Sequence, residues 1–233
     1  MTRLAWHFLY PGGLLRTGKA APPDGEWLKY DGPIVPCESG LHASERAIDA
    51  LRYAPPEREI VLCRVELAGT IIEHGDPVDK LAASERCILW RLDGKTTDRV
   101  LCEFARWSAA QVLHLWNAPR VVRDYLGTGN EVLRGAAGVV ADSAAWDVAA
   151  GAAARDAARA AASAAAADAA AAGTAAKAAA GAAAWAAASA AAWAATGATA
   201  GVGAWDAAWE AARDAQNTEL ERMLNEAREA HDA

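Results

Sequence analysis

The chain has 233 residues, a formal net charge of −7 and a hydrophobic fraction of 53%, which suits one large or two small folded domains. The acidic balance argues against unaided nucleic-acid binding, which needs a basic face. No run of about 18 strongly apolar residues suggests a membrane span, and residues 1–10 are too short and too polar to resemble a signal peptide. We therefore expect a cytoplasmic protein with neither a nucleic-acid nor a membrane partner.

Residues 1–95 are predicted to form a β-rich domain with one early helix. Ser44 is placed to cap a helix over residues 45–53, which the following Pro55-Pro56 ends. Gly69 is expected to bend the chain between two strands. Apolar runs bounded by turn residues predict strands over residues 4–10, 60–67, 70–73 and 87–92.

A helical period begins near residue 97. Asp98 can cap a helix that Pro119 ends, a shorter helix over 121–126 stops at Gly127, and Asn130 can cap a helix over 131–140. Because this last helix enters the next segment without a linker, the two halves of the chain are expected to pack together.

An alanine tract dominates the second half, with 34 alanines in residues 151–200. Its non-alanine positions recur mostly every four residues, and such a stripe circles a straight helix by about 40° per step. The tract should therefore break into short antiparallel helices that approach closely, followed by an amphipathic helix over 217–230. Glycines are the expected breaks: Gly173, Gly197, Gly201 and Gly203 first, then Gly151 and Gly181.

Tryptophans are the main large side chains in the tract. They are predicted to fill gaps between alanine-faced helices, and the alternative is an aromatic surface for a partner chain. The candidates for such a surface are Trp185, Trp193, Trp205 and Trp209.

Four cysteines lack the CxxC spacing of zinc or redox motifs and are expected to be reduced, buried thiols: Cys37, Cys63, Cys87 and Cys102. A zinc site from Cys37 and His42 with His74 or Cys87 is conceivable, but these spacings match no known zinc motif. We therefore predict no metal.

These patterns predict an α+β protein whose β-rich N-terminal domain packs on an all-α layer of short alanine-rich helices. Three segments are expected: an α+β domain over 1–95, connecting helices over 96–140, and a helical repeat region with its terminal amphipathic helix over 141–233.

The segment Cys37-Glu38-Ser39-Gly40-Leu41-His42-Ala43, followed by a helix and an apolar strand, resembles a domain of unknown function found in phage and bacterial proteins. Asp79-Lys80-Leu81-Ala82-Ala83-Ser84 resembles the later motif of that domain. The resemblance covers residues 1–95 and implies no established chemistry.

The second half resembles the Ala/Trp-rich repeats of immunity-type proteins, which open on a helix and close on a Gln-Asn-x-x-Leu helix. Here these parts are residues 121–126, the tract and Gln216-Asn217-Thr218-Glu219-Leu220. Together the two resemblances imply a phage or prophage accessory gene with a role in host–phage conflict.

Gly40-Leu41-His42-Ala43-Ser44 before a helix and an apolar strand also resembles the middle of ADP-ribosyltransferase folds. That resemblance implies NAD as cofactor, with His7 as the first-strand histidine and His42 in place of the family's tyrosine. Glu103 stands at about the distance of the catalytic glutamate, but on a predicted helix instead of a strand. If neither histidine has this role, each is expected at a strand end, bonded to a backbone carbonyl.

The leading hypothesis is a non-enzymatic accessory protein that binds a small molecule or a protein partner and needs no cofactor. The alternatives are an NAD-dependent ADP-ribosyltransferase and a structural helical protein that self-associates into a homo-oligomer. The candidate ligand-binding residues are His7, Trp27, Tyr30, His42, Tyr53, Asp79 and Lys80.

Overall fold

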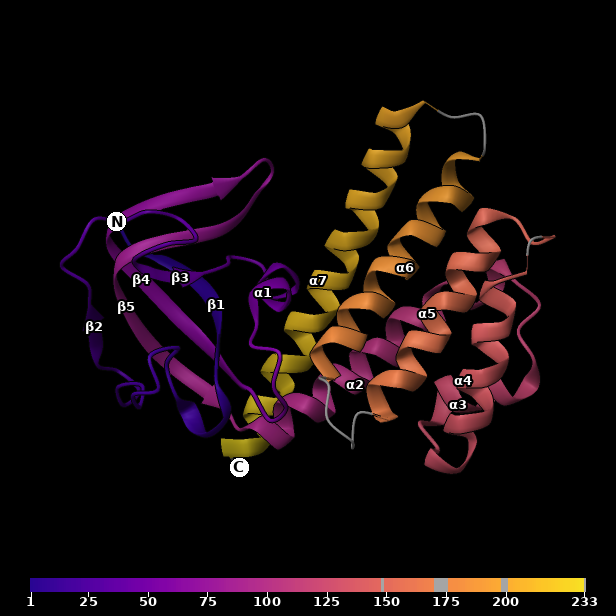
Figure 1. Cartoon of the computed structure of the whole chain (residues 1–233), viewed down its shortest axis with the longest axis horizontal. Helices are drawn as coiled ribbons and strands as arrows, with labels where there is room; N and C mark the ends of the chain where they lie inside the picture. Colours follow the sequence, from indigo (N-terminus) through magenta and orange to yellow (C-terminus); the bar gives the residue numbers. More distant parts are fainter. Residues whose placement is uncertain (148, 170–175, 198–200, 233) are drawn as a thin grey trace. The chain divides into compact units, whose positions relative to one another are not determined.

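A computed structural model of the chain describes residues 1–147, 149–169, 176–197 and 201–232 (Figure 1). It confirms the α+β prediction, since an antiparallel sheet forms in the N-terminal region and helices follow it. The chain divides into a sheet unit, Met1–Asp98 with Glu221–Ala233, and a helical unit, Arg99–Leu220.

The elements, in chain order, are β1 (Arg3–Leu9), η1 (Pro11–Gly13), β2 (Trp27–Lys29), β3 (Leu41–Ala43), α1 (Ala47–Tyr53), β4 (Val61–Gly75), β5 (Val78–Leu92), α2 (Gly94–Gln111), η2 (Leu113–Leu115), α3 (Arg120–Thr128), α4 (Glu131–Ala145), α5 (Ala152–Ala169), α6 (Ala176–Thr196) and α7 (Val202–Asp232).

The sheet is built on the β4–β5 hairpin. Its order is β1-β4-β5-β2, β3 also pairs with β5, and all pairs are antiparallel. The backbones of Trp6 in β1 and Ser44, which follows β3, exchange hydrogen bonds of 2.7 and 3.0 Å. The sheet therefore curls until two of its margins meet, and it encloses an apolar cluster that includes Leu9, Val65 and Leu81.

The hairpin strands are longer than predicted. The expected strands over 60–67 and 70–73 form one strand, β4, in which Gly69 has φ +74° and the register shifts between Ala68 and Ile71. Gly69 thus marks a β-bulge within one continuous strand. β5 begins at Val78, well before the predicted start at Cys87, because its alanine-rich first half pairs with both β3 and β4.

The first helix is capped from far along the chain. Ser44 was the wrong cap: it pairs with β1, and α1 begins at Ala47 after Arg46, whose side chain forms an ion pair with Asp49 and makes no capping hydrogen bond. The Ala47 N–H donates instead to Glu221 Oε1 of α7 at 3.2 Å, and Trp6 Nε1 donates to the same oxygen at 3.0 Å. Glu221 therefore links the C-terminal part of α7 to β1 and α1 through these two hydrogen bonds.

The connecting helices follow the prediction with shifted ends. Asp93 and not Asp98 caps α2, because its Oδ1 accepts from the backbone N–H groups of the next turn. α3 passes the predicted stop at Gly127 and ends before Gly129, which is left-handed. The Asn130 cap is confirmed, since its side chain accepts from Val132 N at 3.0 Å.

The alanine tract forms α5 and α6 and is followed by α7, and the three helices run in alternating directions (Figure 1). The predicted break at Gly197 is confirmed, with φ +69° directly after α6. Gly151 and Gly201 precede α5 and α7, whereas Gly181 and Gly203 lie inside helices. Gly173 lies outside the described residues.

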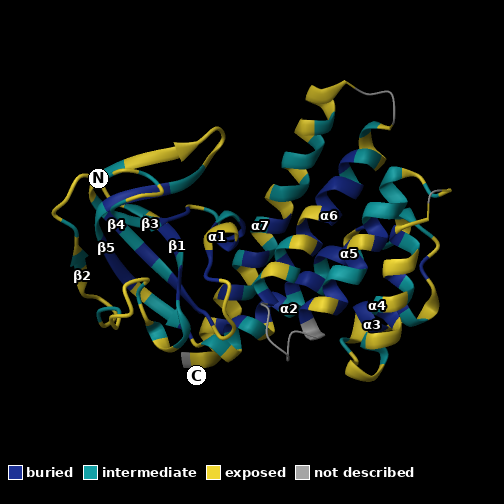
Figure 2. Cartoon of the chain, viewed as in Figure 1, coloured by how far each residue is buried: buried dark blue, intermediate teal, exposed yellow. Residues whose placement is uncertain are grey.

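Alanine lets these helices approach closely. α6 has ten buried residues, nine of them alanine (Figure 2), and a Cβ added at Gly138 of α4 would lie 3.2 Å from Ala165 Cβ of α5. Among the described helices, α6 alone is long and apolar enough to cross a membrane by length and composition, with 50% of that stretch buried. It packs against α5, and its Ala184 carbonyl oxygen accepts a hydrogen bond from Gln216 of α7.

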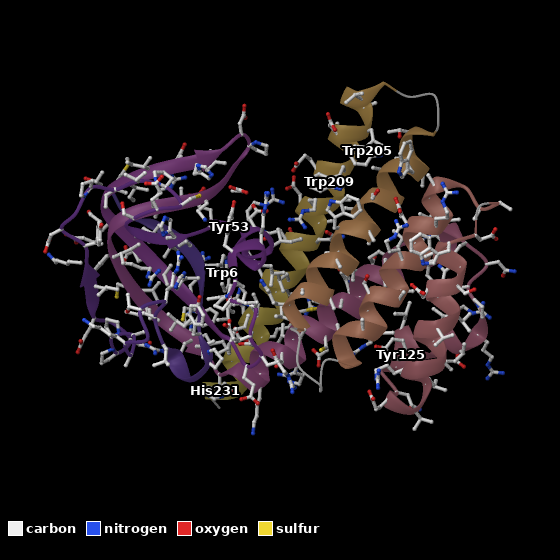
Figure 3. All side chains as sticks on the ribbon, in the orientation of Figure 1. Trp6, Tyr53, Tyr125, Trp205, Trp209 and His231 are labelled. Carbon is white, nitrogen blue, oxygen red and sulfur yellow. The ribbon has the colours of Figure 1, made fainter. Side chains whose placement is uncertain are left out.

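Three of the four candidate surface tryptophans pack on one another. The Trp193 and Trp205 ring centroids are 6.0 Å apart across α6 and α7, and Trp205 stacks on Trp209 at 6.4 Å (Figure 3). Trp185 is 51% exposed. The gap-filling interpretation therefore describes Trp193, Trp205 and Trp209, and Trp185 is left as the exposed member.

We predict that Glu221→Leu destabilises the sheet unit by about 2–4 kcal/mol, because Trp6 Nε1 and the Ala47 amide lose their acceptor. Hydrogen exchange of the β1 and α1 amides, followed by mass spectrometry, measures the loss. Glu229→Leu, at an exposed position on the same helix, is the control and should change protection by less than about 0.5 kcal/mol. Equal losses of protection in Glu221→Leu and Glu229→Leu would refute the role of Glu221 as the cap of α1.

Candidate functional site

The sheet unit contains a cavity of about 1060 Å³, large enough for a ligand of dinucleotide size. Residues from β1, β2, β3, β5, the end of α1 and the segment 10–19 line it. Its lining is strongly basic in a chain of net charge −7: the charged residues are Arg16, Lys19, Lys29, Lys80 and Arg86, with Glu38 as the one carboxylate among the described lining residues.

Arg86 is the most unusual of these residues. It is 5% exposed, and its NH1 donates to the His42 carbonyl oxygen at 2.9 Å. Within the described part of the chain it forms no ion pair with a carboxylate. Burial lowers its pKa to about 10, so the guanidinium still carries its charge at neutral pH. A buried cation without a counter-charge is costly, and a bound anion would offset that cost.

Two neutral imidazoles lie beside this guanidinium. Burial, and then the charge of Arg86, lowers the pKa of His7 well below 6.5. Burial, and then the charges of Lys80 and Arg86, lowers the pKa of His42 to about 4. His42 Nε2 accepts a 3.1 Å hydrogen bond from the Cys37 N–H, which leaves the ring proton on Nδ1. The expected bond from His42 to a backbone carbonyl is thus replaced by one from a backbone N–H.

A second group of polar side chains surrounds Tyr53, the last residue of α1, which lines the cavity. Tyr53 OH donates to Asp79 Oδ2 at 2.7 Å, and Arg52 NH1 lies 3.1 Å from the same oxygen. Burial and the bond to Asp79 raise the pKa of Tyr53 to about 12. Lys80 Nζ lies 3.6 Å from the Tyr53 ring centroid, a cation–π contact. An aromatic face and an ammonium group are thus placed side by side (Tyr53 is labelled in Figure 3).

The structure brings most of the predicted ligand residues together. His7, Tyr30, His42, Tyr53 and Lys80 all line the cavity, and Asp79 contributes by holding Tyr53. Trp27 does not line it, since it lies in β2 opposite Cys87 and is 40% exposed. Glu103 belongs to α2 in the helical unit, where it pairs with Arg99 at 3.1 Å.

Sequence reasoning missed Arg86, Arg16 and Lys19. Arg86 stood just before the predicted strand at Cys87, so its place inside β5 was not recognised. The available signal was its position directly before the apolar run that begins at Cys87. Arg16 and Lys19 lie in a segment without periodicity, and nothing in their spacing indicated a cavity.

The cysteines differ from one another. All four are free, as expected, and Cys63 and Cys87 are buried, but Cys37 is exposed and lines the cavity. Its Sγ lies 3.5 Å from His74 Nε2. Within the described residues no group of three His, Cys, Asp or Glu side chains is arranged to hold a metal ion.

Comparison with known proteins yields one family. Residues 20–99 match the family model of a domain of unknown function, DUF7666. No curated protein and no solved structure matches the chain. The matched region contains β2, β3 and the β4–β5 hairpin, and with them His42, Lys80 and Arg86, whereas His7 and Arg16 precede it.

We predict that stability falls as the pH drops from 6.5 to 4. The pKa of His42 is lower in the folded protein, at about 4, than the 6.5 of the unfolded chain. Between these two pH values the native state binds fewer protons than the unfolded chain. The contribution of His42 to the free energy of unfolding is therefore fully present above pH 6.5 and is lost as the pH falls toward 4. Each such histidine contributes at most about 1.4 kcal/mol per pH unit.

Urea unfolding of the protein and of His42→Gln at several pH values measures this slope. The variant should show the smaller loss between pH 6.5 and 4. At pH 8 the imidazole of His42 is neutral in both the folded and the unfolded parent protein. The difference in unfolding free energy between parent and variant at that pH therefore reports only the effect of the substitution on packing. Parallel pH profiles would contradict the assignment.

Proposed function

We propose that the sheet unit binds a small anionic molecule in its cavity and performs no chemistry on it. The observation that carries this proposal is the buried Arg86 guanidinium, which lacks an ion-pair partner within the described residues and lines a cavity with four other basic residues. A charge kept in such a place reduces stability unless a ligand compensates it.

The surrounding groups favour an anion with an aromatic or planar part. Two neutral imidazoles can donate or accept hydrogen bonds, and Tyr53 presents a ring that already has a cation beside it. Pockets that combine apolar walls with a few convergent polar groups are typical ligand sites. In this proposal the ligand's negative group lies near Arg86 and Lys80, and its ring lies against Tyr53 or Tyr30.

The wider role follows from the resemblances noted in the sequence. We propose a non-enzymatic accessory protein of phage or bacterial origin in which the sheet unit senses or sequesters an anionic metabolite. A protein partner remains the alternative ligand, and Trp185 is the exposed candidate for self-association of the helical unit.

Inorganic pyrophosphate is a suitable first probe. We predict that millimolar pyrophosphate raises the thermal unfolding midpoint of the protein, because it binds the folded state alone. In Arg86→Met the rise should disappear, whereas the midpoint without pyrophosphate should be unchanged or higher, since a buried unpaired charge has been removed. Differential scanning fluorimetry measures both.

Lys95→Gln is the matched control, because Lys95 is an exposed cation of the sheet unit that does not line the cavity. It should keep the full response. Arg16→Gln combined with Lys19→Gln provides a second test on exposed positions, where misfolding is not expected. If pyrophosphate has no effect on the parent protein, or the same effect on Arg86→Met, anion binding at this site is refuted.

A second candidate function is NAD-dependent ADP-ribosyl transfer, which is favoured by His7 and His42 lining one cavity. The catalytic glutamate required by that resemblance has no counterpart among the described lining residues, where Glu38 is the sole carboxylate. A glutamate is needed to orient the ribose, so we favour binding without catalysis.

Incubation with NAD and mass analysis for nicotinamide separates the two functions. We predict no release above that in a protein-free control. Release that disappears in both His7→Ala and His42→Ala would instead establish the transferase and overturn the binding-only proposal.

A further inference from the structure

Cys37 is held in an uncommon conformation at the tip of a tight turn. Its φ is +70°, a value that non-glycine residues seldom adopt. The turn is closed by hydrogen bonds between Val35 and Ser39, including Ser39 N to Val35 O at 2.8 Å. The Cys37 N–H is held by His42 Nε2. The side chain is thereby directed to the cavity, exposed and in a fixed position.

The sulfur has two nitrogen neighbours from the hairpin. His74 Nε2 of β4 lies 3.5 Å from Sγ, and Lys80 Nζ of β5 donates to it at 3.6 Å. Lys80 is itself positioned by the ring of Tyr53. An ammonium beside a sulfur attracts an anionic reagent to it, and an imidazole there can take up the thiol proton during attack on a disulfide.

The other cysteines are less exposed than Cys37. Cys63 and Cys87 are buried, and burial raises the pKa of both, that of Cys63 to about 12. Cys102 lies half-buried in α2 of the helical unit. The chain therefore provides its own internal controls for any claim about Cys37.

We propose that Cys37 is a reactive thiol that forms a mixed disulfide with negatively charged low-molecular-weight disulfides, a class that includes glutathione disulfide. The Cys37 thiolate attacks one sulfur of the disulfide, a new S–S bond forms to Sγ, the original S–S bond breaks, and the other half leaves as a thiolate with the bonding electron pair. The proton lost from Cys37 goes to solvent or to His74.

The preference of Cys37 for negatively charged disulfides rests on the proposed function, because it depends on the same basic residues that line the cavity. Arg16, Lys19 and Lys80 line the cavity together with the sulfur, and the buried Arg86 adds a fixed positive charge. A cleft lined by charge of one sign raises the local concentration of oppositely charged reactants. Once formed, the adduct would place an anionic group in the cavity and compete with a bound anion.

The test compares two disulfide reagents on the intact protein: dithiobis(nitrobenzoate), which carries two negative charges, and the neutral dithiodipyridine. Both react with the same thiolate, so the ratio of their rates reports the charge around the sulfur and not its ionisation. We expect one fast-reacting thiol per chain, mapped to Cys37 by peptide mass analysis and lost in Cys37→Ser. The rate ratio should exceed that of a free cysteine peptide by about tenfold.

Lys80→Gln should lower this ratio several-fold, while Lys95→Gln should leave it unchanged. A ratio equal to that of the free peptide, or a fast phase that survives in Cys37→Ser, would overturn the inference.

Pyrophosphate separates this inference from the proposed function. If pyrophosphate stabilises Cys37→Ser but Cys37 of the parent reacts no faster than Cys102, the cavity binds anions and the reactive thiol is refuted. If Cys37 reacts fast with the expected ratio but pyrophosphate neither stabilises the protein nor slows the reaction, the thiol stands and the anion-binding function fails.

Discussion

The pairing of β4 with β5 is the constraint on which the sheet unit depends. β1 pairs with β4, while β2 and β3 pair with separate parts of β5. The two histidines of the cavity are therefore positioned by strand register: His7 lies opposite Cys63, and His42 lies opposite Ala82. A slip of one residue in the β1–β4 pair would turn His7 to the other face of the sheet, and a slip in the β3–β5 pair would do the same to His42.

The β4–β5 hairpin is also bent, at the β-bulge between Ala68 and Ile71. At the bulge, Thr70 N donates to Ser84 Oγ at 2.9 Å, and a Cβ at Gly69 would lie 2.1 Å from that oxygen. Only glycine fits both the space and the positive φ there. Beyond β3, Ser44 pairs with Trp6 of β1, and Arg86 of β5 lines the cavity.

The sequence predicts those parts of the fold that depend on local chemistry. The first strand, the Asn130 cap and the glycine end of α6 all follow from neighbouring residues. The cap of α1 could not be predicted, because its acceptor, Glu221, is distant in sequence and only the folded unit brings it to Ala47. The start of β5 was missed for a similar reason: charged and alanine-rich residues form a strand there because they are paired on both sides.

The candidate site was predictable to the same degree. His42 and Tyr53 were identified because His42 belongs to the motif that carries the family resemblances and Tyr53 ends the helix after it, and the structure places both at one cavity. Arg86 and the exposed Cys37 were not identified, since burial of a charge and exposure of a thiol depend on tertiary packing. Residue type predicts the usual environment, and functional groups are often those placed in the unusual one.

The helical unit shows how a surface of methyl groups acquires a unique packing arrangement. Alanine side chains are nearly interchangeable, so they bring helices together without fixing their register. They also leave backbone carbonyls accessible between helices. Gln216 Nε2 donates to Ala184 O at 2.8 Å, and Tyr125 OH donates to Ala164 O at 3.2 Å.

A third polar contact links α6 to α5, where Ser189 Oγ donates to Asp156 Oδ2 at 2.7 Å. Ser189 is buried, so a shift of one helix along the other would leave its hydroxyl without a partner in a low-dielectric interior. The sparse polar residues of the tract thus select one register among many that the alanines alone would allow. In this unit the small side chain of alanine allows the helices to approach closely, and the few polar residues determine their register.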